Sequence, residues 1–291
     1  MRLCCAPMRI ALLCLFICAA AQAENSIKDP GAPGPNTVDL SRASAMGGAG
    51  AAIATSNDAL TLNPAGLSQT RRYHFELDGV YDSRFPAEGV LASIVDTASS
   101  PVGSGILFSR WGSGQSKGRG EGWGLGLSYS SPIGQGLYSG GQTKFLRYRG
   151  PDGLVAKWAQ DLGVLSKRGG FSWAAVVQNI STEKLPLFPL TGTVGLAWGE
   201  DTDWHLAFDY KADFSETSHV KHKAAVGAEV LVGESIALRG GLTWDASAHL
   251  WWASTGVGLL TERGGLQLVW RRRVSGGYDQ LFEAGLTLYL E

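Results

Sequence analysis

Large apolar residues alternate with polar or small residues over most of the chain after residue 71. The clearest run is 73–82, where one side is large and apolar and the other polar: Tyr73, Phe75, Leu77 and Tyr81 against His74, Glu76, Asp78 and Asp82. Successive side chains of a strand point to opposite faces, so this period of two predicts a β-strand with one apolar face. No helical period of comparable length competes.

Similar runs recur along the chain, separated by clusters of Gly, Ser, Asp and Pro such as 111–120 and 149–153 that are typical of turns. A bulge or kink is expected in the third run, because it alternates weakly and begins with Gly103 and Gly105. The pattern predicts about fourteen strands: 73–82, 88–96, 103–111, 122–131, 143–149, 154–166, 171–180, 190–199, 204–212, 219–232, 235–245, 250–261, 264–274 and 280–290.

An antiparallel all-β chain of this kind is either a soluble sandwich or a membrane barrel. In a sandwich the apolar face is the interior, whereas in a barrel it faces lipid and aromatic residues collect at the strand ends. Closure also leaves no unpaired strand edge in the membrane. We therefore predict a transmembrane antiparallel β-barrel of about 14 strands, with the sandwich as the alternative. The aromatic residues close to predicted strand ends are Trp111, Tyr129, Trp198, Tyr210, Trp244, Trp251, Trp252 and Trp270.

Residues 1–23 predict a secretory signal peptide. Arg2 and Arg9 are basic, 10–17 are apolar, and 21–23 read Ala-Gln-Ala, a small-x-small cleavage site. All four cysteines lie in this segment, so no disulfide framework or thiol nucleophile is expected after cleavage. Only 18% of the 291 residues are charged and the formal net charge is -1. No basic footprint is present, and we expect no nucleic-acid partner.

Residues 24–70 do not alternate. Residues 30–35 are a run of Pro, Gly and Ala, and 43–54 consist almost wholly of Ala, Gly, Met and Ile. Such small residues suit a backbone packed tightly inside another structure. We predict that 24–70 form a small N-terminal plug in the lumen and 71–291 the barrel, with a disordered periplasmic tail as the alternative for the first segment.

Two motifs in this segment carry a family resemblance. They are Met46-Gly47-Gly48-Ala49 and Asn63-Pro64-Ala65-Gly66. In this position they resemble the N-terminal hatch of the FadL outer-membrane transporters and of their shorter PorV/PorQ-like relatives. The resemblance implies a fourteen-stranded barrel closed by a hatch, in the outer membrane of a Gram-negative bacterium, that lets small hydrophobic compounds pass.

The resemblance also implies that Asn63, Pro64 and Ala65 couple the hatch to the wall. A rigid Asn-Pro turn that merely enters the first strand is the alternative. The chain is much shorter than typical FadL transporters, and Tyr289-Leu290-Glu291 lacks a terminal aromatic residue. Both departures favour the PorV-like branch, whose members act as shuttles in a secretion system. A purely structural outer-membrane barrel is a further alternative.

Polar residues on the non-lipid side of the strands are the remaining candidates for chemistry. We interpret them as lumen-lining networks, which any such barrel contains. His219 and His222 are three apart on a strand and so point to opposite faces, which argues against a zinc site. We predict no enzyme, no cofactor and no metal, and as partners outer-membrane lipid with a small hydrophobic ligand or an exported protein. The lumen-lining candidates are His74, Glu76, Asp78, His205, Asp209, Arg239 and Arg271.

Overall fold

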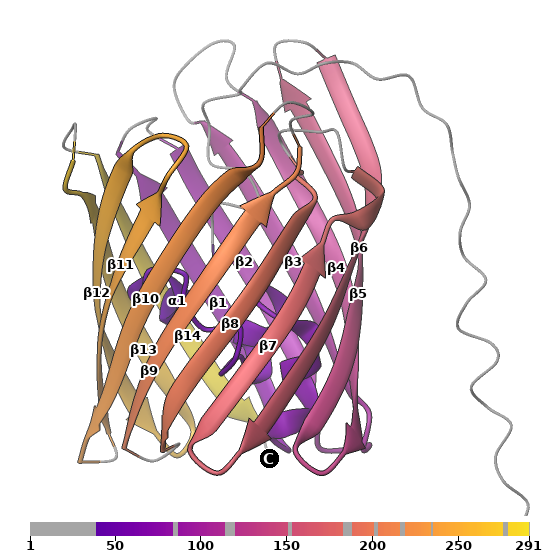
Figure 1. Cartoon of the computed structure of the whole chain (residues 1–291), viewed down its shortest axis with the longest axis vertical. Helices are drawn as coiled ribbons and strands as arrows, with labels where there is room; N and C mark the ends of the chain where they lie inside the picture. The colour runs from indigo at the N-terminus through magenta and orange to yellow at the C-terminus, as the bar shows by residue number, and fades with distance from the viewer. Residues whose placement is uncertain are drawn as a thin grey trace, which may run out of the picture.

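Fourteen antiparallel strands form one closed barrel in the computed structural model (Figure 1). Each strand pairs with its neighbours in sequence, and the last strand pairs with the first. The predicted all-β fold and strand number are therefore confirmed. The structure describes residues 39–83, 87–113, 120–150, 153–182, 188–200, 203–215, 219–233, 235–275 and 279–290. The predicted signal peptide at 1–23 and residues 24–38 of the predicted plug lie outside these ranges.

The strands are of unequal length, with the three longest in succession. They are β1 Tyr73–Asp82, β2 Ala87–Asp96, β3 Gly103–Ser113, β4 Glu121–Gly134, β5 Leu137–Gly150, β6 Gly153–Arg168, β7 Phe171–Gln178, β8 Thr191–Glu200, β9 Trp204–Asp213, β10 Lys221–Val232, β11 Ile236–Asp245, β12 Leu250–Thr261, β13 Gly264–Arg273 and β14 Gln280–Leu290. The helices are α1 Ser41–Ala45, η1 Ser56–Leu60, η2 Pro64–Gln69 and η3 Ile180–Thr182. No helix in the described part of the chain is both long and apolar enough to cross a membrane.

The two ends of the barrel differ in the length of their connections. Residues 114–120 and 179–190 connect strands at one end, which we call the loop end. At the opposite end, the turn end, 135–136 and 169–170 are short connections, and β14 finishes there at Leu290 (Figure 1). Short turns face the periplasm and longer loops the outside in outer-membrane barrels. The loop end is therefore the outer end in a membrane of that kind.

The inward and outward faces of the strands differ sharply in polarity. In β1, Asp78 has no exposed surface, whereas its neighbour Leu77 is 41% exposed on the outside. The outward residues of the other strands are likewise mostly large and apolar, for example Leu127, Val194 and Leu268. An outer face of this kind excludes the soluble sandwich, because it would expose an apolar belt to water. Lipid is the solvent that this face fits.

Two of the aromatic residues predicted for the outer belt instead face inward. Trp111 is buried and packs with Leu146, Tyr148 and Phe188, and Trp252 lines a cavity in the lumen. The outward position beside Trp111 belongs to Arg110, which is exposed, so the strand register places the indole inside. The other six are exposed on the outer face as predicted: Tyr129, Trp198, Tyr210, Trp244, Trp251 and Trp270.

The predicted bulge in β3 is wrong. Pairing of β3 with β2 and β4 runs residue by residue from Gly103 to Gly112, and the wall carries a register shift instead between Pro132 and Gly134 of β4. Gly105 serves packing, because a Cβ there would lie 2.7 Å from the Leu60 side chain. Strand β5 begins at Leu137, earlier than the predicted 143, since its first turn-end residues contain glycines that hide the alternation.

We expect an arginine on the lipid-facing side of the wall to destabilise the barrel in proportion to its depth. Leu286 lies mid-strand in β14 on the outer face, and Leu290 lies on the same face at the strand end. Leu286→Arg should lower the free energy of unfolding of the vesicle-inserted protein by about 2–4 kcal/mol, and Leu290→Arg by about 1 kcal/mol or less. Urea titration of vesicle-inserted protein measures both, and equal effects would contradict the membrane placement.

Candidate functional site

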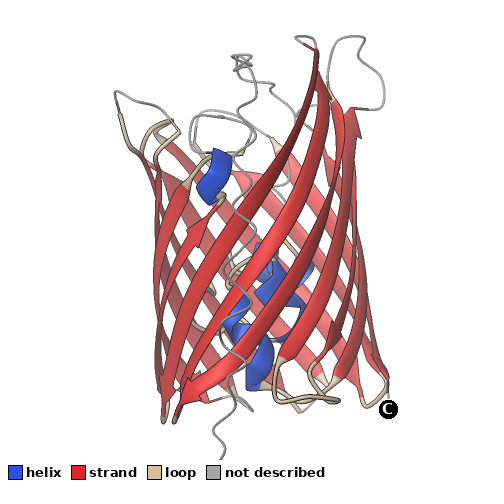
Figure 2. Ribbon diagram, turned by 90° about the vertical axis from the view of Figure 1, so that its right-hand side faces the viewer, coloured by secondary structure: helices blue, strands red, loops and turns tan. Residues whose placement is uncertain are grey.

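Residues 39–70 lie inside the barrel, and we call them the luminal segment (Figure 2). The segment contains α1, η1 and η2 and adds no strand to the wall. Its residues Met46, Ala49, Ala51 and Ala52 are buried together with small wall residues of β7 to β10: Ala174, Val176, Ala197, Ala207 and Ala225. The largest hydrophobic cluster among the described residues is therefore the contact between the luminal segment and the inner wall.

The Met46-Gly47-Gly48-Ala49 motif packs on glycines of β10 and β11. A Cβ added at Gly241 would lie 2.2 Å from the Met46 carbonyl carbon, and one at Gly227 would lie 2.4 Å from the Met46 oxygen. Only glycine lets the two backbones come this close. Gly47 and Gly48 have φ angles of 73° and 81°, which turn the chain where a larger residue would be strained.

The Asn63-Pro64-Ala65-Gly66 motif begins η2 and is completely buried. Asn63 is the N-cap: its side-chain oxygen accepts the backbone N–H of Ala65 at 3.1 Å, which satisfies one of the free donors of the helix start. The side-chain amide of Asn63 donates to the carbonyl of Ala51 at 3.0 Å. A Cβ at Gly66 would lie 1.9 Å from the Ala54 oxygen. The motif thus ties together the two halves of the luminal segment.

The same motif presses on the wall at β5 and β6. A Cβ at Gly163 would lie 2.0 Å from Asn63 Oδ1, and one at Gly140 would lie 2.5 Å from the Pro64 carbonyl carbon. Ser130 Oγ, from β4, donates to the carbonyl of Ala65 at 2.7 Å. The motif is therefore more than a turn that enters β1, because it also contacts strands far along the chain.

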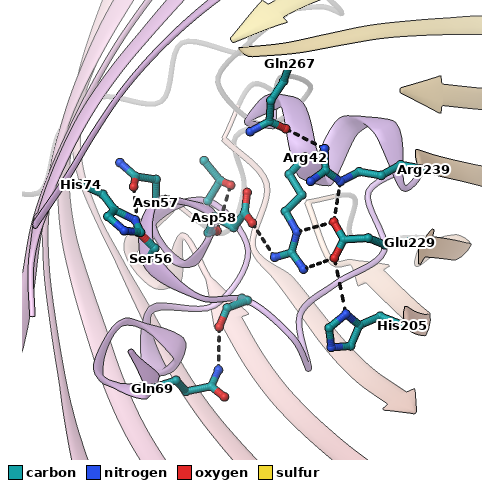
Figure 3. Close-up of polar contacts among 12 residues, drawn as sticks. Arg42, Ser56, Asn57, Asp58, Gln69, His74, His205, Glu229, Arg239 and Gln267 are labelled. Carbon is teal, nitrogen blue, oxygen red and sulfur yellow. Dashed lines mark hydrogen bonds and ion pairs between the residues drawn. The ribbon is translucent and has the colours of Figure 1, made fainter. Parts of the chain in front are cut away.

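A buried ionic cluster connects α1 to β10 and β11 (Figure 3). Arg42 donates twice to Glu229, with Nε–Oε2 at 2.9 Å and Nη2–Oε1 at 2.8 Å, and pairs with Asp58 through Nη1 at 2.9 Å. Arg239 donates through Nε to the same Glu229 carboxylate, and His205 Nδ1 lies 3.4 Å from it. Two-point contacts between arginine and carboxylate fix orientation as well as distance. Glu229 is therefore one of the wall residues that position α1.

Wall carboxylates also bind the backbone of the luminal segment. Asp209 Oδ2 accepts the N–H groups of Gly50 and Ala51 at 3.0 and 2.9 Å. Asp78 accepts both the backbone N–H, at 3.1 Å, and the hydroxyl of Ser41. These wall groups satisfy backbone donors of the segment that would otherwise be buried without a partner.

The structure brings only some of the predicted lumen-lining residues together. His205 and Arg239 meet at Glu229, whereas Asp78 and Asp209 hold separate parts of the luminal segment. His74 contacts the hydroxyl of Ser56. Of the other two predicted residues, Glu76 is buried on the inner side of β1. Arg271 lines the cavity described below.

Sequence reasoning missed the amide and hydroxyl anchors of the wall. Gln142 donates to the carbonyl of Leu60, and Gln178 to that of Thr61, each at 2.9 Å. The signal that could have found them is an uncharged polar residue at an inward strand position. Gln142 lies just before the predicted strand 143–149, so the alternation assigns it no face.

A cavity of about 250 Å³ lies on the loop-end side of the luminal segment. Gly47, Gly48 and Leu62 form its floor, and inward residues of β8 to β14 form its sides. Its apolar lining comes from Leu62, Leu250, Trp252 and Leu281, and its charged lining from Asp39, Asp209, Lys211, Lys223, Asp245 and Arg271. Among the described residues, no cluster of three or more His, Cys, Asp or Glu side chains is arranged to hold a metal ion.

Solved structures share this fold at low sequence identity. No protein-family model matches the chain, and no curated protein is significantly similar in sequence. The Ralstonia pickettii toluene transporter TbuX has a TM-score of 0.65 at 14% identity, covering 91% of this chain and 100% of that one. The CymD monoaromatic hydrocarbon channel has 0.64 at 13%, covering 91% and 99%. A Pseudomonas aeruginosa FadL homologue has 0.66 at 10%, covering 86% and 98%. The chain thus has the fold of the FadL-type channels.

We expect a side chain at Gly241 to displace the luminal segment without opening the barrel. In Gly241→Val the new side chain collides with the Met46 backbone. Gly240→Val is the control, because Gly240 faces outward and a Cβ there would have its nearest neighbour at 3.9 Å. A collision of this kind is worth about 1–3 kcal/mol, so trypsin should cleave after Arg42 about tenfold faster or more in Gly241→Val only. Equal cleavage of both variants would contradict the tight packing.

Proposed function

We propose that the protein is a channel of the Gram-negative outer membrane for small hydrophobic compounds. The observation that carries the proposal is the cavity directly above the luminal segment, inside a barrel of the FadL type. Two solved structures with this fold are described as a toluene transporter and a monoaromatic hydrocarbon channel. The proposed action is passage rather than catalysis, and the proposed ligand is a compound with a single aromatic ring.

The size and lining of the cavity support such a ligand. An engineered apolar cavity of about 150 Å³ binds benzene, and this one has a volume of about 250 Å³. Contact with Leu250, Trp252 and Leu281 would stabilise a bound ring by roughly 25 cal/mol for each Å² of apolar surface buried. The charged lining keeps the remainder of the cavity hydrated, so a small apolar molecule has one preferred side on which to lie.

Passage beyond the cavity requires the luminal segment to move. The strand ladder is continuous around all fourteen strands, and Asn63 to Ala65 lie against the paired strands β5 and β6. We infer that Met46 to Ala49 and Asn63 to Gly66 are the gate, and that Arg42 holds the gate shut through Glu229. The wall itself stays paired while the segment shifts.

Filling the cavity should slow hydrocarbon entry. Thr193 lines the cavity on β8, and its hydroxyl has no hydrogen-bond partner among the described residues. Its neighbour Val194 is 56% exposed on the lipid side. Thr193→Phe should reduce toluene uptake by cells that depend on this channel by about tenfold, because the added ring occupies the ligand volume, and Val194→Phe should leave uptake unchanged.

Equal uptake by the two variants would overturn the proposed channel. So would uptake by the wild type that is no greater than that of cells without the protein. In that case, co-purification of an exported protein with the barrel would favour the PorV-like shuttle instead.

Removing the Arg42 contact should let the luminal segment move aside and open the lumen more often. Arg42→Met deletes both ion pairs between α1 and its carboxylate partners, and a broken buried pair is worth about 3–5 kcal/mol. Ion-conducting events in planar lipid bilayers should rise at least about tenfold. Lys144→Met is the matched control, because it breaks the 2.7 Å pair with Asp161 within the wall and leaves the luminal segment in place. Equal conductance of the two variants would show that the segment is not the gate.

A further inference from the structure

Three arginines point outward from the barrel at the loop end of β3 and β5. Arg110 of β3 and Arg147 of β5 lie in one row across the sheet, with Trp123 of β4 between them. Arg149 lies two residues farther toward the loop end, opposite Glu121. Within the described ranges, none of the three arginines has an ion-pair partner. We call Arg110, Arg147 and Arg149 the basic patch.

An aromatic group lies within and just below the basic patch: Trp123 is level with Arg110 and Arg147, and the other two rings lie one step closer to the turn end. The rings of Trp123 and Phe145 are 5.4 Å apart, and those of Phe145 and Trp158 are 5.0 Å apart. All three lie on the outer face, where Trp158 is 63% exposed. Aromatic rings collect at the boundary between the acyl chains and the head groups of a membrane. Arg110 and Arg147, which are level with Trp123, and Arg149, one step beyond it, therefore lie at the depth of lipid head groups.

A groove of about 540 Å³ runs over the basic patch. Phe108 and Leu154 give it apolar sides, and the three arginines with Glu121 line the rest. The positive charge exceeds the negative by two, on a face that the chain otherwise fills with apolar residues. A charged guanidinium at the edge of lipid is unfavourable unless a counter-ion is present, and its planar donors match phosphate oxygens in pairs.

We propose that this groove binds the phosphorylated head group of an outer-leaflet lipid, with the lipid's acyl chains lying along Phe108 and the aromatic group. The net charge of the patch suits a head group with two phosphates, and the apolar sides suit an amphiphile rather than a free ion. The proposal rests on the outer-membrane placement but not on passage through the lumen. A lipid held here fixes the depth and the rotation of the barrel at β3 to β5.

The test uses the full-length protein in detergent, with bisphosphorylated lipid A as the probe and native mass spectrometry as the readout. The wild type should retain lipid A in preference to phosphatidylcholine. Arg147→Gln/Arg149→Gln should weaken retention by about 10- to 30-fold, as expected for two basic residues that face an anionic lipid. Arg272→Gln is the matched control, because Arg272 also lies near the loop end, on β13, but outside the patch.

Several outcomes would overturn the proposal. They are equal retention by the double variant and the wild type, an equal loss in the Arg272 control, and equal retention of lipid A and phosphatidylcholine by the wild type. Heat-modifiable migration on a gel verifies that each variant is folded. If the double variant does not fold, the single change Arg149→Gln, at an exposed position, gives the same comparison with an expected loss of about fivefold. Uptake of toluene should be unchanged in either case, which separates this proposal from the channel.

Discussion

The width of the lumen is the constraint on which the rest of the structure depends. About eight strands enclose an interior that their own side chains can fill, and this barrel has fourteen. The inner faces of opposite strands therefore cannot reach one another, and the luminal segment supplies the missing core. It does so with small residues, since Ala49, Ala51 and Ala52 lie on alanines of the wall. Glycines such as Gly241 and Gly140 bring the two backbones into contact. Filling the lumen thus selects small residues on both surfaces at once.

The period of two explains how much of this architecture the sequence could predict. Alternation assigns a face to every residue of a strand such as β1, so the closed barrel and the polar lumen followed without any knowledge of contacts. It failed at the start of β5, where Ser139 and Gly141 take the outward positions at which alternation expects large apolar residues. Gly140, on the inward side, makes room for Pro64 and adds a second glycine to this stretch. The partners of the two motifs were also beyond reach, because Gly227 lies about 180 residues after Met46 and nothing local to either marks the contact.

The ionic cluster around Glu229 is better suited to positioning the luminal segment than to stabilising the barrel. Burying a carboxylate and two arginines removes their hydration, and the attraction among them only roughly compensates for this loss. What the cluster does provide is a single position of α1, because a two-point contact between Arg42 and Glu229 tolerates little displacement. The alanine and glycine surfaces are smooth and would allow the segment to slide. The ionic cluster therefore fixes the position of α1 along the wall, which the packing of small residues alone does not.

The unequal strength of the two kinds of contact decides which part of the molecule can move. Every strand is held by backbone hydrogen bonds to two neighbours, and in a membrane no water can replace a broken one, so opening the wall breaks many bonds together. The luminal segment is held by separate contacts, among them those of Asp78, Asp209 and Glu229, and the lumen offers water to each group that is released. Local opening follows the least protected contacts. A change of state in this barrel therefore begins at the segment, and the cavity above Gly47 and Gly48 is where a molecule entering from the loop end first meets it.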